Sequence, residues 1–185
     1  MSFKLTAVLL ILLAAVGSYA YFFGKPPPPP KKETEFTYDV ELSDVFHIDV
    51  RHKDKRLVLD WNDGESKWYF QDKGMGEVDQ GRLNGLRLLL TGPGTKRTLF
   101  RERVADLSDY GLDNPETVTT VKLKDGAVHV LLMGHRTPDD GSYYIKNQNE
   151  EAVYLVDAAW GNEIIRFVNE PPITKDVQDL SVPSS

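Results

Sequence analysis

The chain has no cysteine among its 185 residues. This absence excludes disulfide bridges, thiolate metal sites, cysteine nucleophiles and lipid attachment through a cysteine. It leaves the compartment open, because an extracytoplasmic domain with an adequate hydrophobic core needs no disulfides. Hydrophobic residues make up 41% of the chain, and we expect them to supply such a core.

Acidic residues outnumber basic ones after residue 32. Residues 1–32 hold four of the 22 Lys and Arg residues and none of the 28 Asp and Glu residues, so the remainder carries a net charge of −10. Binding to a phosphate backbone requires clustered Lys and Arg. We therefore expect no nucleic-acid partner.

Motifs for cofactor or metal binding are also lacking. No glycine-rich loop joins a predicted strand to a predicted helix, so no nucleotide site is predicted. Asp60-x-Asn62-x-Gly64 resembles a calcium loop only faintly, because Gly64 has no side chain to offer and Gln71 replaces the bidentate glutamate. We interpret this stretch as a turn and predict no cofactor, no metal and no catalytic residues.

The four histidines are expected to be solvated or hydrogen-bonded rather than functional. They are His47, His52, His129 and His135. Strand alternation puts His47 and His52 on opposite faces, so they are not expected to share a metal ion. We expect His129 to lie beside Lys122, and His135 to lie in a loop.

One long apolar run is present near the N-terminus. Residues 5–23 comprise 19 residues without a charge, close to the roughly 20 that span a bilayer as a helix. Tyr19, Tyr21, Phe22 and Phe23 gather at one end, as aromatic residues do at a membrane interface. The alternative is a signal peptide cleaved after Ala20. We favour an uncleaved anchor, because the apolar run continues past Ala20.

The orientation of this anchor has two readings. Lys25, Lys31 and Lys32 follow the run, and a positive-inside count would place the C-terminal domain in the cytoplasm. The short N-terminal tail is instead typical of a signal anchor, and we predict an extracytoplasmic domain. The five prolines of residues 26–30 predict a polyproline rod of roughly 15 Å, which we interpret as a stiff spacer rather than a ligand for an aromatic groove.

Three strands and a helix are predicted after the spacer. VFHIDVR (45–51) alternates so that Phe46, Ile48 and Val50 share one face. RLVLDW (56–61) and KWYFQ (67–71) predict two further strands, with an apolar face formed by Leu57, Leu59, Trp61, Trp68 and Phe70. VDQGRLNGLRLLL (78–90) then shows helical spacing of its leucines, which predicts an amphipathic helix that covers the sheet.

The second half begins with a predicted hairpin over residues 118–133. Asp125-Gly126 is typical of a two-residue turn, which places Leu123 opposite Val128 and puts the valines of the second strand on the buried face. SYYIKN (142–147) and AVYLVD (152–157) predict two more strands, and AAWGNEIIRFV (158–168) predicts an amphipathic helix that ends before two prolines.

The predicted architecture is therefore an α+β fold. It comprises antiparallel sheets with two amphipathic helices, in the order strand-strand-strand-helix and then strand-strand-strand-strand-helix, preceded by an N-terminal transmembrane helix. We expect a membrane anchor with a short tail in residues 1–24, a proline-rich spacer in 25–43, a single domain in 44–172 and a flexible tail in 173–185.

The stretch DLSDYGLDNPETVTTVKL (106–123) is the most distinctive in the chain. Residues 106–112 predict a short helical turn, and Gly111 suits the backbone reversal that follows it. Asn114-Pro115 blocks further helix and releases the chain into a strand. Leu107 and Leu112 are expected to point inward, so we interpret the stretch as a structural corner rather than an active-site loop.

This stretch also carries a resemblance. Together with LLMG (131–134), GSYYIK (141–146) and AVYLVD (152–157), it resembles the family known as domain of unknown function 4340, over most of residues 44–172. The resemblance implies a membrane-anchored, extracytoplasmic domain and no catalytic residues. Some relatives sit beside components of ABC-type transport systems linked to gliding motility. Relatives often have more than one copy of the unit, whereas one is predicted here, and this puts a transport-auxiliary role in doubt.

These patterns favour a non-enzymatic, single-pass membrane protein whose domain binds or braces another envelope protein. One alternative is an envelope hydrolase that uses turn carboxylates such as Asp139 and Asp140. Ser108 and Ser142 lack a nucleophile elbow, and of Tyr143 and Tyr144 one is expected in the core and the other outside. A second alternative is a secreted ligand-binding domain released at Ala20.

Overall fold

A computed structural model describes residues 3–23, 35–100 and 106–174 of the chain. The chain divides into two units, Met1–Glu33 and Thr34–Ser185. The first contains helix α1 (Phe3–Phe23). Among the described residues, no helix combines the length and the apolar character needed to cross a membrane. The structure therefore does not support the transmembrane helix predicted over residues 5–23, and the polyproline rod of residues 26–30 lies outside the described residues.

The second unit is built on an antiparallel sheet with helices packed on it, which confirms the α+β prediction. The described strands of the sheet follow the order β1-β5-β9-β8-β7-β6-β2-β3-β4. Their bounds are β1 (Glu35–Phe36), β2 (Val45–His52), β3 (Lys55–Asn62), β4 (Lys67–Phe70), β5 (Gly94–Phe100), β6 (Thr117–Leu123), β7 (Val128–Arg136), β8 (Ser142–Asn147) and β9 (Val153–Asp157).

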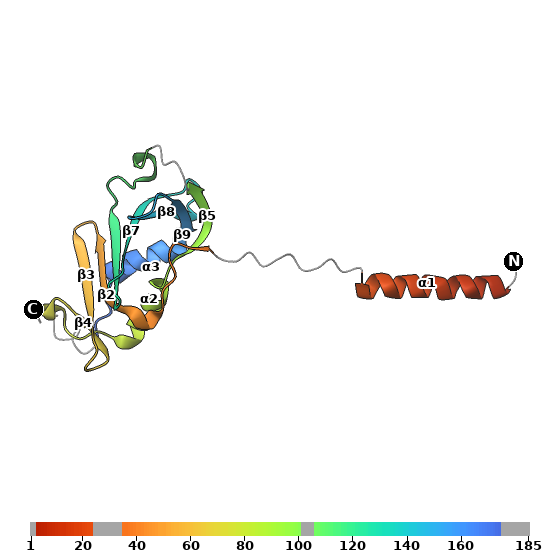
Figure 1. Ribbon diagram of the computed structural model, residues 1–185, viewed down its shortest axis with the longest axis horizontal. Helices are drawn as coiled ribbons and strands as arrows, with labels where there is room; N and C mark the ends of the chain where they lie inside the picture. Colours follow the sequence, from red (N-terminus) through yellow and green to blue (C-terminus); the bar gives the residue numbers. More distant parts are fainter. Residues whose placement is uncertain (1–2, 24–34, 101–105, 175–185) are drawn as a thin grey trace, which may run out of the picture. The chain divides into compact units, whose positions relative to one another are not determined.

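Helices α2 (Gln80–Leu89) and α3 (Ala158–Asn169) pack against each other and on one side of this sheet. Helix α3 crosses that side and contacts β2 and β3 as well as β8 and β9 (Figure 1). It begins where the Asp157 carboxylate accepts a hydrogen bond from the Ala159 amide at 2.8 Å. Trp160 and Ile164 face the core, as the helical spacing predicts.

We call the side that carries α2 and α3 the inner face and the opposite side the outer face. Ile48, Val50, Leu57 and Leu59 are at most 1% exposed on the inner face. Phe46 was predicted to share this face with Ile48 and Val50, but it is only half-buried. A bulge between Val45 and His47 shifts the alternation, so that Val45 occupies the core in its place.

Two strands were not predicted. Strand β5 follows α2 directly and pairs with β9, with Thr95 opposite Val156. Its residues 95–98 are all Thr, Lys or Arg, so the segment lacks the apolar alternation by which a strand is recognised. The two-residue strand β1 pairs with β5 and lies in the segment predicted as spacer, where Tyr38 is also buried and donates a hydrogen bond to the Leu90 carbonyl at 2.8 Å.

The hairpin between β6 and β7 has a different register from the predicted one. Its loop has three residues, because the Leu123 amide donates to the Ala127 carbonyl and the Gly126 amide donates to the Leu123 carbonyl, both at 2.9 Å. Gly126 has φ of +93°, as this loop type requires. The one-residue slip turns the other set of side chains inward. Leu131 and Met133 are therefore buried, whereas the valines of β7 are not.

The edge strand β4 is capped by a side chain. The Gln80 amide accepts a hydrogen bond from the Trp68 main-chain N–H at 3.1 Å and donates one to the Trp68 carbonyl at 2.8 Å. Gln80 is the first residue of α2. Its side chain thus occupies both main-chain groups that Trp68 turns outward from the sheet.

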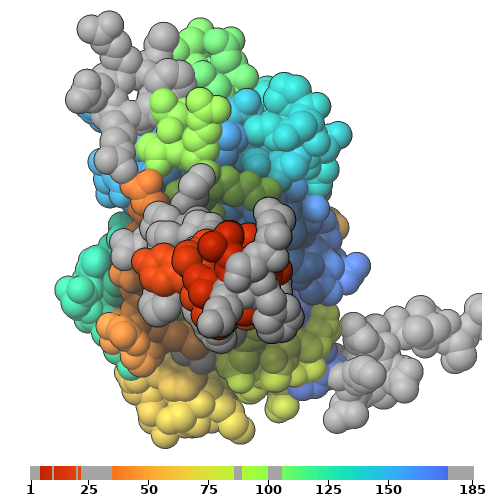
Figure 2. All heavy atoms as spheres, turned by 90° about the vertical axis from the view of Figure 1, so that its right-hand side faces the viewer, coloured from red at the N-terminus to blue at the C-terminus, as the bar shows by residue number. Residues whose placement is uncertain are grey.

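The segment after α3 is tied back to the domain. The Ile173 and Val78 main chains form a β-bridge, and the Thr174 amide donates to the Glu77 carbonyl at 3.1 Å. The remainder of the predicted flexible tail lies outside the described residues. In the space-filling view, the residues where β7 turns into β8 (cyan) lie at the upper end of the second unit and those of β3 and β4 (yellow) lie at the lower end (Figure 2).

Candidate functional site

The stretch that follows residue 105 forms a tight corner, as predicted. The Asp106 carboxylate accepts a hydrogen bond from the Ser108 amide at 2.9 Å, which starts a short 3-10 helix over Ser108–Tyr110. Gly111 then takes a left-handed conformation with φ of +67°, which a residue with a Cβ atom adopts less readily. Leu112 is 2% exposed and Leu107 is half-buried. The corner therefore fixes its own backbone.

Three sequence blocks meet at this corner. A Cβ atom on Gly134 would lie 2.0 Å from the Tyr110 carbonyl oxygen, so only glycine permits this approach of β7 to the corner. The Tyr110 ring meets the Tyr144 ring edge-on, with centroids 4.9 Å apart. The Tyr-Gly-Leu, Met-Gly and Tyr-Tyr blocks thus depend on one another for their packing.

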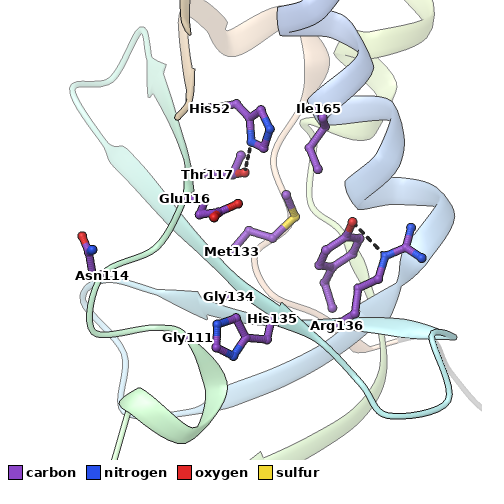
Figure 3. A pocket seen from close by; sticks show the side chains of 11 residues that line it. His52, Gly111, Asn114, Glu116, Thr117, Met133, Gly134, His135, Arg136 and Ile165 are labelled. Atoms are coloured by element: carbon purple, nitrogen blue, oxygen red, sulfur yellow. Dashed lines mark hydrogen bonds between the residues drawn. The ribbon is translucent and has the colours of Figure 1, made fainter. Parts of the chain in front are cut away.

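An opening is left where β7 continues beyond its partner β6. Strand β6 begins at Thr117 opposite Met133, whereas β7 continues to Arg136 through a register shift against β8. This opening is a cleft of about 250 Å³, which lies between the end of β2, the corner, the end of β7 and α3 (Figure 3). It is lined by His52, Gly111, Asn114, Glu116, Thr117, Met133, Gly134, His135, Arg136, Tyr143 and Ile165.

His52 enters the cleft from the end of β2. Its Nδ1 atom lies 2.8 Å from the Thr117 hydroxyl oxygen, and Thr117 is 2% exposed. Burial lowers the pKa of His52 below its ordinary value, with a further decrease from Lys53, while Glu116 opposes the change. The imidazole is therefore neutral at pH 7 and can offer its remaining ring nitrogen for a hydrogen bond.

Arg136 lies on the opposite side of the cleft, where neighbours fix its position. Its Nε atom donates to the Tyr143 hydroxyl at 3.0 Å, and its terminal nitrogen donates to the Asn162 side-chain oxygen at 2.5 Å. The Tyr143 hydroxyl also donates to that oxygen at 3.1 Å. The Tyr143 hydrogen bond is the main cause that raises the pKa of Arg136. The guanidinium is thus held in place before any ligand arrives.

The lining of the cleft combines apolar and polar side chains. Met133, Tyr143 and Ile165 give it an apolar wall, and a few fixed polar groups surround this wall. Such a combination is typical of sites that bind a small group in one orientation.

The family model described as Domain of unknown function (DUF4340) matches residues 68–170. The chain belongs to this family. The match confirms the resemblance that the corner motif indicates, and it begins at Trp68, after β2 and β3. This DUF4340 match covers the corner and every residue that lines the cleft except His52. No curated protein and no solved structure matches the chain.

The structure places the other histidines of this DUF4340 protein outside the centre of the cleft. His47 lies on the outer face with Nδ1 2.6 Å from the Asp60 carboxylate, whereas His52 is on the inner face, so the two lie on opposite faces as predicted. His129 is opposite Val121 rather than beside Lys122, because of the hairpin register. It stacks on Tyr38 at 4.3 Å, and burial lowers its pKa.

His135 belongs to strand β7 rather than to a loop. It lines the rim of the cleft and is exposed. Its ring lies where a Cβ atom on Gly111 would be, with Cδ2 only 2.5 Å from that position. Among the described residues, no group of three or more His, Asp or Glu side chains is arranged to hold a metal ion.

The carboxylates considered for hydrolysis are engaged in turns. Asp139 accepts hydrogen bonds from the Thr137 hydroxyl and the Gly141 amide, and these lower its pKa. Asp140 lies 3.8 Å from Arg136 and is exposed. Asn62 accepts hydrogen bonds from the Gly64 and Glu65 amides. The side chains of Asp139 and Asn62 therefore each stabilise their own turn.

The serines and tyrosines have structural contacts. Ser142 is buried and its amide donates to the Thr137 hydroxyl at 3.1 Å, while Ser108 belongs to the corner. Tyr143 is on the inner face and Tyr144 contacts Tyr110, so the two point to different sides as predicted.

The sequence did not indicate the cleft itself. The lining residues Asn114, Glu116, Thr117, Met133 and Ile165 come from three separate segments. Asn114-Pro115 and Gly134 were the signals within reach, because a proline restricts the residue before it and a glycine permits close approach of another segment.

Proposed function

We propose that this protein is a non-enzymatic interaction or assembly module of the cell envelope. The observation that carries the proposal is the cleft beside the corner. Its polar side chains His52 and Arg136 are held by hydrogen bonds to neighbouring side chains. A preformed recess with a few fixed polar groups favours recognition of a side chain presented by a partner. A transport complex is the class of partner that the family resemblance favours.

The proposal includes a membrane tether through residues 5–23 and an extracytoplasmic position of the domain. Its support comes from the sequence, which has 19 consecutive residues without a charge followed by five prolines. Such a run suits insertion into a bilayer, and the prolines would hold the domain at a distance from it.

Photo-crosslinking in cells tests the interaction. Asn114 lies at the rim of the cleft, and Asn149 lies in the turn after β8, at the opposite end of the strand that carries Tyr143. Both are exposed asparagines. A photoreactive amino acid at position 114 should give one defined crosslinked protein, whereas position 149 should not. Equal crosslinking from both positions, or none from position 114, would contradict the proposal.

Extraction and labelling test the tether. The full chain should stay with membranes during alkaline carbonate treatment, and two lysines placed at Leu12 and Ala15 should release it, because charges at the centre of a span are costly. Since the chain has no cysteine, an Asn149→Cys variant carries a single thiol. A membrane-impermeant maleimide should label it in intact cells if the domain lies outside the cytoplasm, and its failure to react would place the domain inside.

A further inference from the structure

Among the described residues, no α-helix of the second unit covers the outer face of strands β2, β3, β6 and β7. Helices α2 and α3 both lie on the inner face (Figure 1). On the outer face, Val118, Val130 and Leu132 are half-buried, and Val128 is 42% exposed. Val118 and Leu132 are directly opposite each other on neighbouring strands. This part of the sheet therefore presents an apolar strip to its surroundings.

Two arginines stand side by side next to this strip. Arg51 on β2 is directly opposite Arg56 on β3. Like charges in such a pair destabilise a sheet, so the arrangement has a cost. Asp49 neutralises only one of them, because both of its oxygens accept hydrogen bonds from Arg56, at 3.0 and 2.7 Å. Among the described residues, Arg51 has no acidic partner within 4.0 Å.

The Arg51 guanidinium lies at a shallow depression. Asp49, Arg51, Arg56, Val118 and Thr120 line a hollow of about 170 Å³. One side of the hollow thus offers a charge and the other side a valine that continues into the apolar strip. A guanidinium presents parallel N–H donors that match a carboxylate in two bonds.

The charge of the rest of the molecule narrows the choice of ligand. Past residue 32 the chain carries a net charge of −10, which repels anionic lipid surfaces as a whole. A local guanidinium beside apolar side chains instead suits a single carboxylate with apolar neighbours, held at close range where screening is weaker. An extended protein segment that carries acidic and apolar residues two positions apart, and therefore on one side of the segment, has this chemistry.

We infer that the outer face around Arg51, Val118 and Thr120 is the docking surface for an acidic, extended segment of a partner protein. A carboxylate of that segment pairs with Arg51, and its apolar residues lie on Val118 and Leu132. This inference rests on the proposed function, since it gives the interaction module a second contact surface and states the chemistry of its partner.

Binding of a defined peptide tests the inference. The probe is a fluorescent eight-residue peptide, Ser-Glu-Ser-Val-Ser-Glu-Ser-Val, whose glutamates and valines share one side of an extended chain. It is added to the full chain in zwitterionic detergent at low salt. Fluorescence anisotropy should show binding, and the change Arg51→Gln should weaken it about tenfold or more. Amide NMR shifts should change at Arg51, Val118 and Thr120. Peptides with glutamine or lysine in place of glutamate should bind at least tenfold more weakly than the original.

The matched control is Arg82→Gln, which removes the same charge from the exposed side of α2. It should leave the affinity within twofold of that of the unaltered chain. Absence of peptide binding at millimolar concentration, or an equal effect of both variants, would overturn the inference. The same holds if vesicles of anionic phosphatidylglycerol bind in an Arg51-dependent manner while the peptide does not, because the ligand would then be a membrane.

The two proposals fail in different ways. If position 114 crosslinks to a defined partner but the glutamate peptide does not bind, the interaction module stands and only the surface around Arg51 is wrong. If the peptide binds through Arg51 but no position crosslinks to a partner in cells, the surface has the stated chemistry and the proposed function is wrong.

Discussion

The two faces of the sheet differ in kind. On the inner face, apolar side chains such as Ile48 and Leu59 are fully buried beneath α3. On the outer face of the same strands, charged residues such as Asp49 lie beside the half-buried Val58, and Arg51 is opposite a second arginine. Burial decides the fold on one side, whereas the other side is free to carry features that the fold does not need. Residues whose arrangement does not stabilise the fold are therefore the better candidates for function.

The largest effect should come from shortening an inner-face side chain. Leu59→Ala removes a side chain that is 0% exposed, and we expect a loss of about 2–5 kcal/mol in the free energy of unfolding. Val58→Ala changes the neighbouring residue on the outer face and should cost less than about 1 kcal/mol. Urea denaturation measures both, and equal losses would mean that the outer face is covered as thoroughly as the inner one.

The next effect concerns the contact between the corner and strand β7. Gly134→Ala should cost about 1–3 kcal/mol, because its Cβ atom would collide with the Tyr110 carbonyl. Gly85→Ala is the control, since nothing lies within 4 Å of the added atom in α2 and alanine favours a helix. Thermal unfolding should show a lower midpoint for the first variant and an unchanged or higher one for the second. A neutral Gly134→Ala would show that the corner is loosely packed.

A smaller effect of opposite sign is expected at Arg51. Arg51→Glu replaces a like-charge pair by an opposite-charge pair with Arg56, which should stabilise the domain by about 0.2–1 kcal/mol. The same variant should lose binding of the acidic peptide. Denaturation and anisotropy on one preparation test both effects. Lower stability of this variant would remove the argument that the arginine pair is kept at a cost.

The smallest expected effect is a pH dependence of the free energy of unfolding that two histidines cause. His52 and His129 are on the inner face, and burial lowers the pKa of both. Since the unfolded chain takes up these protons at higher pH than the folded one, their contribution to stability is complete above the unfolded pKa of about 6.5. It is lost as the pH falls through the folded pKa.

Denaturation at several pH values should therefore show a decline that begins near pH 6.5. The double variant His52→Gln with His129→Phe should flatten this part of the profile. A decline that persists unchanged in the double variant would assign it to other groups.

The sequence predicted the fold class and most elements, because apolar alternation and helical spacing reflect the inner face. Leu57, Leu59, Trp68 and Phe70 are buried as the alternation indicates. Strand β5 was missed because its first residues are polar and its pairing depends on β9, about 60 residues away. The hairpin register was wrong because Asp125-Gly126 occurs in two-residue and three-residue loops alike, and only the hydrogen bonds of Leu123 distinguish them.

The candidate site was less accessible to prediction than the fold. The corner could be inferred locally, since Gly111 and Asn114-Pro115 act on their own backbone. The cleft depends on where β6 begins relative to β7, and that relation follows from the register that was predicted wrongly. The arginine pair could not be inferred from the sequence, because the opposition of Arg51 to Arg56 requires the pairing of β2 with β3.

The amide of Gln80 has a consequence for how these molecules behave at high local density. An exposed sheet edge normally invites a second chain to add itself as a further strand. At Trp68 the donor and the acceptor that such a strand would need are already bonded within the molecule. Two copies of the protein therefore cannot join their sheets through main-chain hydrogen bonds at this residue. Association is directed instead to surfaces made of side chains, which can distinguish one partner from another.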